Sequence, residues 1–85
     1  MYNLNDVYLA SKILGFTFDK FSPDDFLEGI NIESEHGLIN PKTNVTNDDL
    51  IVTSKIALAH LNEFPNYYNK EYGLKVFENF LKSKL

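Results

Sequence analysis

Residues 47–63 read Asn-Asp-Asp-Leu-Ile-Val-Thr-Ser-Lys-Ile-Ala-Leu-Ala-His-Leu-Asn-Glu, and this stretch has the pattern of a helix at the centre of the fold. On a helical wheel of about 100° per residue, several residues of this stretch fall within one arc together with the residue that follows the stretch, and they form a core face. The members of the core face are Leu50, Ser54, Ala57, Leu61 and Phe64. The opposite side carries Asp48, Lys55 and Asn62. Because apolar residues cover most of the circumference, we expect a central helix over 47–63 that is packed between other helices.

Two helices are predicted before the central one. Asn5-Asp6 followed by apolar residues at helical spacing predicts a first helix that ends at Gly15, where glycine can adopt a left-handed cap. Ser22-Pro23-Asp24-Asp25 predicts the start of a second helix, with serine as the N-cap and two acids at the positive helix end. This helix should run to about Glu35 and close at His36-Gly37. Between the two helices, a linker should place Phe16, Phe18 and Phe21 in the core.

The ends of the central helix have their own signals. Thr46 followed by Asp48 and Asp49 repeats the start signal, and Pro65 should end the helix near Phe64. Pro65 can also begin a C-terminal helix over 66–84 that packs on the rest, with Gly73 marking a kink or break. A chain of 85 residues can bury one core only. We therefore predict an all-α fold, with residues 1–85 forming one small domain of about four helices.

Charge and composition narrow the classes of function. The chain carries 12 acids and eight basic residues, all of them lysine, for a net charge of −4. Binding to nucleic acid by phosphate neutralisation needs clustered positive charge, and base recognition relies on arginine, so the composition argues against a nucleic-acid partner. The absence of cysteine excludes disulfides and thiolate metal sites. Stability must therefore come from hydrophobic packing.

The chain shows no sequence feature of secretion or membrane insertion. Its start, Met-Tyr-Asn-Leu-Asn-Asp, has neither the positive segment nor the apolar segment of a signal peptide. No apolar run approaches the roughly 20 residues that span a bilayer. We expect a cytoplasmic protein without a membrane partner.

One polar stripe on the central helix is a candidate functional site. It consists of Asp49, Thr53, Ile56, His60 and Glu63, which recur at spacings of three and four residues. The end of the second helix supplies Glu35 and His36, and the two histidines are the only ones in the chain. Imidazole and carboxylate ligands suit zinc, manganese or iron, which makes a divalent metal site of five candidate ligands one hypothesis. The candidate ligands are His36, His60, Glu35, Glu63 and Asp49.

The same residues have simpler interpretations. A histidine beside an acid could act as a general base, but no catalytic residue can be assigned. His60 could instead be a half-buried histidine hydrogen-bonded to Glu63, Glu35 or a backbone carbonyl, and His36 a residue favoured by the helix dipole. The segment Phe64-Pro-Asn-Tyr-Tyr68 could form an aromatic ligand-binding corner or simply close the core.

Three segments together resemble a family of small bacterial and phage domains of unknown function. They are Glu33-Ser-Glu-His-Gly37, Thr43-Asn-Val-Thr-Asn-Asp-Asp49 and the run from Thr53 to Tyr68, which contains Lys-Ile-Ala-Leu-Ala-His-Leu-Asn-Glu-Phe-Pro-Asn-Tyr-Tyr. The likeness covers residues 22–68. Ser54 stands where the family pattern has glycine, and the tail after Tyr68 departs from the pattern. The resemblance implies a fold family and no reaction, so it supplies no catalytic residues.

Three functions from different classes follow. The first is a small, non-enzymatic helical module that binds another protein, favoured by the acidic, aromatic-rich composition and by the lack of a nucleophile-plus-base pattern. The second is a metal-binding or metal-dependent protein that uses the histidine and carboxylate residues. The third is a nucleic-acid-associated protein of phage type, against which the absence of arginine argues.

Overall fold

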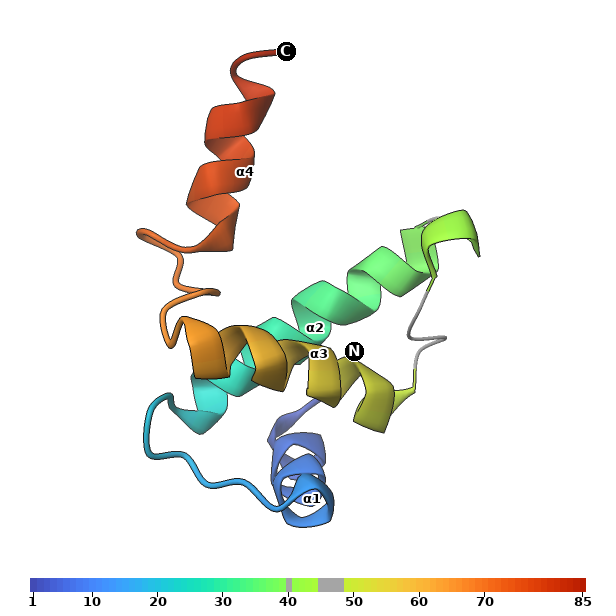
Figure 1. Cartoon of the computed structure of the whole chain (residues 1–85). Helices are drawn as coiled ribbons and strands as arrows, with labels where there is room; N and C mark the ends of the chain where they lie inside the picture. The colour runs from blue at the N-terminus through green and yellow to red at the C-terminus, as the bar shows by residue number, and fades with distance from the viewer. Residues whose placement is uncertain (40, 45–48) are drawn as a thin grey trace.

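The computed structural model describes residues 1–39, 41–44 and 49–85, except for the side chains of residues 36–39. Within these ranges the fold is all-α, as predicted, and contains no strand (Figure 1). The elements in chain order are α1 (Leu4–Leu14), α2 (Pro23–Ile39), a 3₁₀ turn η1 (Pro41–Thr43), α3 (Leu50–Glu63) and α4 (Leu74–Lys82). No helix in the described ranges has the length and hydropathy needed to cross a membrane.

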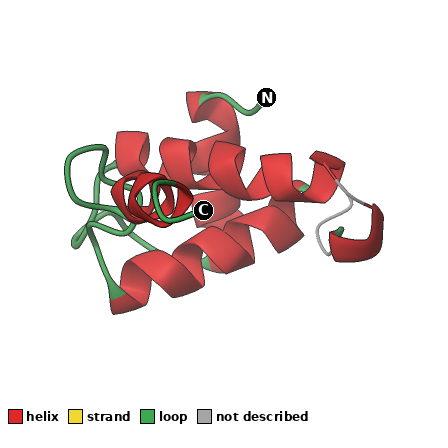
Figure 2. Ribbon diagram, turned by 90° about the horizontal axis from the view of Figure 1, so that it is seen from above, coloured by secondary structure: helices red, strands yellow, loops and turns green. Residues whose placement is uncertain are grey.

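Helices α1, α2 and α3 form a three-helix body. Each of them packs against the other two, with α2 and α3 side by side and α1 across them (Figures 1 and 2). The core between these helices also contains one aromatic side chain of the linker between α1 and α2, Phe21, and one tyrosine of the segment after α3, Tyr68. The buried apolar residues are Val7, Ala10, Phe21, Phe26, Ile30, Ile32, Ala57, Leu61 and Tyr68. Since burying one large apolar side chain stabilises a fold by about 1.5 to 3 kcal/mol, this cluster is the main source of stability.

The aromatic linker between α1 and α2 behaves as predicted. Phe21 is buried and stacks on Phe26 of α2 with ring centroids 6.0 Å apart. Phe16 lies 4.9 Å from the Phe26 ring, and Phe18 packs against both Phe16 and Phe21. The linker thus closes one side of the core with rings instead of regular structure.

Local hydrogen bonds explain where α1 and α2 begin and end. Asn3 caps α1 and forms a capping box with Asp6, so the helix begins before the predicted Asn5. Gly15 ends α1 in the left-handed conformation, with φ 72°, as predicted. Ser22 caps α2 as predicted, because the Asp25 backbone N–H donates to Ser22 Oγ at 3.0 Å and Ser22 N–H donates to Asp25 Oδ2 at 3.0 Å.

The prediction that α2 closes at His36-Gly37 is wrong, since the helix continues to Ile39. A glycine inside a helix costs only about 1 kcal/mol relative to alanine and does not by itself stop the helix. Pro41 follows two residues after the helix end, and a proline disfavours helical conformation in the residue before it. Proline is therefore the stop signal here.

The central helix α3 begins later than predicted, and its core face differs in part from the predicted one. Asp49 is the N-cap, with its Oδ1 accepting from Val52 N–H at 2.9 Å, so the helix begins at Leu50 and not at 47. Thr46 and Asp48 lie outside the described residues. Ser54, Ala57 and Leu61 of the predicted core face are fully buried and Leu50 is half-buried.

Phe64 is exposed, so the prediction that it belongs to the core face is wrong. The helix ends at Glu63, and the backbone of Phe64 is extended, with φ −134° and ψ 97°. An extended residue no longer follows the helical wheel. Its ring therefore points away from the core that the preceding turns bury.

The segment after α3 also departs from the prediction. Residues 64–73, which we call the aromatic corner, form a series of turns, and the last helix begins at Leu74 instead of at 66. Asn69 organises these turns: its Oδ1 accepts from the N–H groups of Glu71 and Tyr72, and its backbone carbonyl accepts from Gly73 N–H at 2.7 Å. A Cβ atom on Gly73 would lie 2.5 Å from the Asn69 backbone, so only glycine fits there.

Helix α4 does not pack along any helix of the three-helix body. It rises from one end of the body, as Figure 1 shows, and only its first residue, Leu74, packs against the core. The prediction of a C-terminal helix packed on the rest is therefore wrong for all but its first turn. The direction of α4 is set by the aromatic corner, because the Leu74 N–H donates to the Tyr67 carbonyl at 2.6 Å.

Candidate functional site

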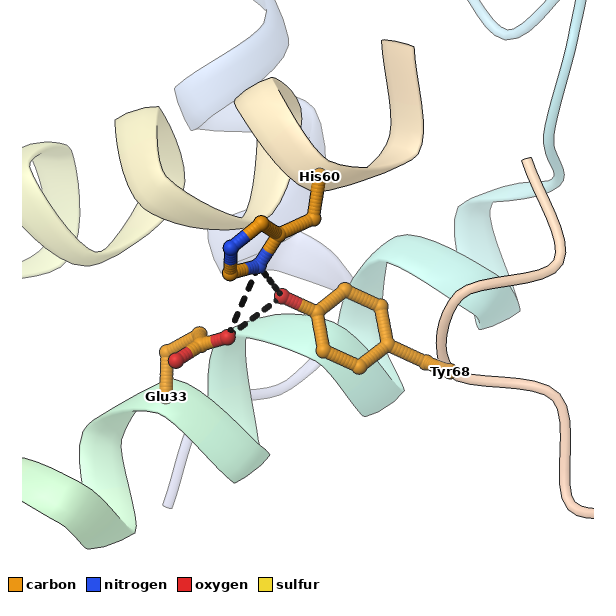
Figure 3. Close-up of polar contacts among 3 residues, drawn as sticks. All are labelled: Glu33, His60 and Tyr68. Atoms are coloured by element: carbon orange, nitrogen blue, oxygen red, sulfur yellow. Dashed lines mark hydrogen bonds and ion pairs between the residues drawn. The ribbon is translucent and has the colours of Figure 1, made fainter. Parts of the chain in front are cut away.

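Three polar side chains from three elements meet where the aromatic corner joins the body. They are Glu33 of α2, His60 of α3 and Tyr68 of the corner, and we call them the polar cluster (Figure 3). The Tyr68 hydroxyl lies 2.6 Å from Glu33 Oε2. Nδ1 of His60 lies 2.9 Å from the Tyr68 hydroxyl oxygen and 3.2 Å from the same Glu33 oxygen. The three polar atoms therefore form a closed triangle.

The hydrogen-bond directions in the polar cluster follow from the donors available. Tyr68 has one hydroxyl proton, which it donates to Glu33, and the ionised Glu33 carboxylate can only accept. His60 Nδ1 must therefore carry a proton and share it between the two oxygens. In the neutral imidazole this tautomer leaves Nε2 as the acceptor. Figure 3 shows Nε2 directed away from Glu33 and Tyr68.

Burial within the polar cluster decreases from Tyr68 to His60. Tyr68 is 3 % exposed, the Glu33 side chain 10 % and the His60 side chain 35 %. Burial raises the pKa of Tyr68 far above its ordinary value of 10, and the hydrogen bond to Glu33 and the negative charge of Glu33 raise it further. Tyr68 is thus a neutral hydrogen-bond donor throughout the physiological pH range.

A glycine in α2 makes room for the Tyr68 ring. A Cβ atom on Gly29 would lie 2.5 Å from Cε2 and 2.7 Å from Cδ2 of this ring. Gly29 is buried in the middle of the helix, where glycine costs about 1 kcal/mol relative to alanine. The close approach of the ring to the α2 backbone explains why the position is glycine.

Tyr67 connects the polar cluster to a neighbouring apolar groove. Its ring lies against the His60 imidazole, with centroids 4.3 Å apart and planes inclined by 32°. Partial burial raises its pKa, and the negative charges of Glu33, Glu78 and Glu63 contribute to the same increase. Tyr67 also lines the apolar groove, which has a volume of about 400 Å³. The groove is lined by Phe64, Asn66, Tyr67, Tyr72, Gly73, Leu74 and Phe77.

The five residues predicted as metal ligands are placed in different surroundings. Asp49 caps the first turn of α3, and the separation of 11 positions between it and His60 corresponds to roughly 16 Å along the helix. Glu35 and Glu63 are exposed, and the side chain of His36 lies outside the described residues. In the described part of the chain, no group of three or more histidine, aspartate or glutamate side chains could hold a metal ion. The hydrogen-bond partners of His60 are Tyr68 and Glu33.

Sequence reasoning missed Glu33 and Tyr68 as partners of His60. A signal for Glu33 was present, because Phe26, Ile30 and Glu33 share one face of α2 at spacings of four and three residues. An acid on the buried face of a helix needs a hydrogen-bond donor. The half-buried state expected for His60 is confirmed, whereas the partners expected for it, Glu63 and Glu35, are wrong.

The comparison with protein families gives a match over most of the chain. A family model described as protein of unknown function (DUF5661) matches residues 7–79. The chain belongs to this family. The match extends beyond the expected range of 22–68 at both ends, so the DUF5661 domain includes most of α1 and of α4. The prediction that the tail after Tyr68 departs from the family is wrong up to residue 79, because the match includes these residues. Neither curated proteins nor solved structures gave a significant match to the chain.

The DUF5661 domain therefore has two adjoining features. In the polar cluster, the Glu33 carboxylate lies next to the His60 imidazole. Such an arrangement orients a histidine and fixes its tautomer. The apolar groove continues into α4 through Leu74 and Phe77, which belong to both. Since Tyr67 touches His60 and lines the groove, the polar cluster positions the wall of the groove.

Proposed function

We propose that this DUF5661 protein is a non-enzymatic interaction module that binds another protein through α4 and the aromatic corner. One observation carries the proposal: α4 presents apolar side chains to solvent. Phe77, Phe80 and Leu81 are 62 %, 59 % and 63 % exposed, and Val76 is partly exposed beside them. We call these four residues the α4 face. Their spacing of three and four residues places them along one side of the helix.

The α4 face is continuous with exposed rings of the aromatic corner. Phe64 and Tyr72 are both more than half exposed and line the apolar groove together with Phe77. Taking about 150 to 250 Å² for a whole aromatic side chain, the exposed parts of these residues and the α4 face amount to about 600 Å². Exposed apolar patches of this size are at the upper limit for monomeric proteins and mark interaction sites.

The polar cluster has a supporting role in the proposed function. Glu33 and His60 hold Tyr68, and the adjacent Tyr67 carries the hydrogen bond that fixes the first residue of α4. The buried triangle therefore determines where α4 leaves the body. The geometry of the cluster across three elements can be explained without a chemical role, because orienting the aromatic corner already requires each contact.

Site-specific photo-crosslinking in the cells that make the protein tests this proposal. A photoreactive phenylalanine analogue replaces Phe80 in one variant and the exposed Asn79 in a control variant, which lies on the polar side of the same helix turn. We expect protein adducts from position 80 and none from position 79. Equal adducts at both positions, or none at position 80, would contradict a binding role of the α4 face.

A further inference from the structure

We infer that the partner bound by the α4 face is a second copy of this chain, and that two copies pair with their α4 helices antiparallel. This inference rests on the proposed function and names its partner. The starting point is that α4 cannot cover its own face. The Asn69 turns, the tight approach of Gly73 and the Leu74–Tyr67 hydrogen bond direct α4 away from the body (Figure 1).

Antiparallel pairing would bring complementary apolar surfaces together. Each copy has a groove at the root of α4, lined by the Phe64, Tyr67 and Tyr72 rings, and exposed side chains near the tip, Phe80 and Leu81. The root, which is the N-terminal end of α4, and the tip, which is its C-terminal end, are about 10 Å apart along the helix. In an antiparallel pair, the tip of each copy therefore lies against the root of the other. The same patch then serves both copies, as a two-fold interface requires.

The distribution of charge favours a second copy over an anionic membrane. Residues 70–85 carry four lysines and two glutamates, a net charge of +2, whereas residues 1–69 carry four lysines and ten acids, a net charge of −6. The basic segment 70–85 of one copy is attracted to the acidic body of another copy. An anionic membrane would attract the same segment but repel the body, which carries three times as much charge.

The available area is sufficient for a weak dimer. Two copies that each bury about 600 Å² give about 1,200 Å² in total, at the lower end of the range for specific interfaces. Interfaces at this end of the range include weak and transient ones, so the dimer should dissociate on dilution.

Sedimentation velocity of the purified full chain tests the inference. Between about 1 and about 300 µM, the mean mass should rise from the monomer value of 9.8 kDa toward twice that value. Phe80→Glu should remain monomeric over this range because it places a charge in the apolar interface. Asn79→Glu, which adds the same charge on the polar side, should associate like the unmodified chain. Circular dichroism checks that both variants keep their helical content.

The outcomes separate this inference from the proposed function. If the chain stays monomeric at all concentrations while position 80 crosslinks to a different protein in cells, the inference of a second copy is wrong. The proposed function as an interaction module is then still supported. A monomeric chain that gives no adduct overturns both. A monomeric chain that binds vesicles containing phosphatidylglycerol through Phe80 overturns the second copy in favour of a membrane surface. Association that Asn79→Glu and Phe80→Glu weaken equally also overturns it.

Discussion

The ring of Tyr68 rests directly on the backbone of α2 at Gly29, where an added Cβ atom would lie 2.5 Å from the ring. This contact joins the aromatic corner to the three-helix body, and the hydroxyl of the same ring joins it to Glu33 and His60. Both the edge of the Tyr68 ring and its hydroxyl are therefore fixed. The position of α4 and of the apolar groove follows from that attachment.

Gly29→Ala should destabilise the protein although alanine is the better helix former. The added methyl group displaces the Tyr68 ring, and overpacking of this kind costs about 1 to 3 kcal/mol, against a gain of about 1 kcal/mol in helix propensity. We expect a net loss of up to about 2 kcal/mol in urea unfolding followed by circular dichroism. Glu28→Ala, at the half-exposed neighbouring position, should change stability little. A Gly29→Ala variant more stable than the unmodified chain would contradict the tight contact.

Tyr68→Phe should cost about 1 to 3 kcal/mol, because the buried Glu33 carboxylate loses the donor that lies 2.6 Å away. Tyr8→Phe removes a hydroxyl from a ring that is about half exposed and should change stability by less than about 0.5 kcal/mol. Equal unfolding free energies for the two variants would show that the Tyr68 hydroxyl contributes nothing. The comparison uses urea unfolding of both variants at neutral pH.

Stability should fall as the pH rises through about 10, the ordinary pKa of tyrosine. Below this pH, Tyr68 is protonated in both the folded and the unfolded chain, so it adds no pH dependence. Above it, the unfolded chain loses a proton that the folded chain retains, since burial and Glu33 raise the pKa of Tyr68. The free energy of unfolding then decreases by up to about 1.4 kcal/mol per pH unit.

This alkaline slope should be smaller in Tyr68→Phe. Unfolding free energies measured at several pH values between about 8 and about 11 give the slope for each protein. Parallel slopes for the variant and the unmodified chain would mean that Tyr68 is not the group responsible.

Ser54→Ala and Thr53→Val should be neutral or stabilising, unlike most substitutions in a core. Both hydroxyl oxygens are fully buried and have no hydrogen-bond partner among the residues that the structure describes, and an unpaired buried hydroxyl costs about 1 to 3 kcal/mol. Ser22→Ala is the control, because it removes the cap of α2 and should cost about 1 kcal/mol. Thermal melts of the three variants give the comparison. A loss for Ser54→Ala as large as that for Ser22→Ala would contradict the unpaired state of the hydroxyl.

The helix starts and stops that depend on local chemistry could be predicted from the sequence. Ser22 with Asp25 and the left-handed Gly15 need only their neighbours along the chain, and both are confirmed. The start of α4 could not be predicted, because it depends on the turns around Asn69 and on backbone packing at Gly73. The periodicity of residues 66–84 is compatible with a longer helix, and the local signal against it is Gly73, which was predicted to mark a kink or break and directly precedes α4.

The candidate site was predictable only in part. The sequence singled out His60, whose position on α3 follows from helical spacing. Its partners come from 27 residues before and eight residues after it, so their convergence depends on how α2, α3 and the aromatic corner pack. The exposed α4 face was not expected, because an apolar helix side predicts burial and does not say whether the covering surface belongs to the same chain.

Hydrogen–deuterium exchange of the α4 amides tests whether the α4 face lacks a partner within its own chain, as the described residues show. An unpacked helix of nine residues is marginal in water, so α4 should exchange much faster than α3 in dilute solution. At high concentration, protection of residues 74–82 should rise while that of α3 changes little. Strong protection of α4 already in dilute solution, equal to that of α3, would show that α4 packs on its own body and would contradict the account.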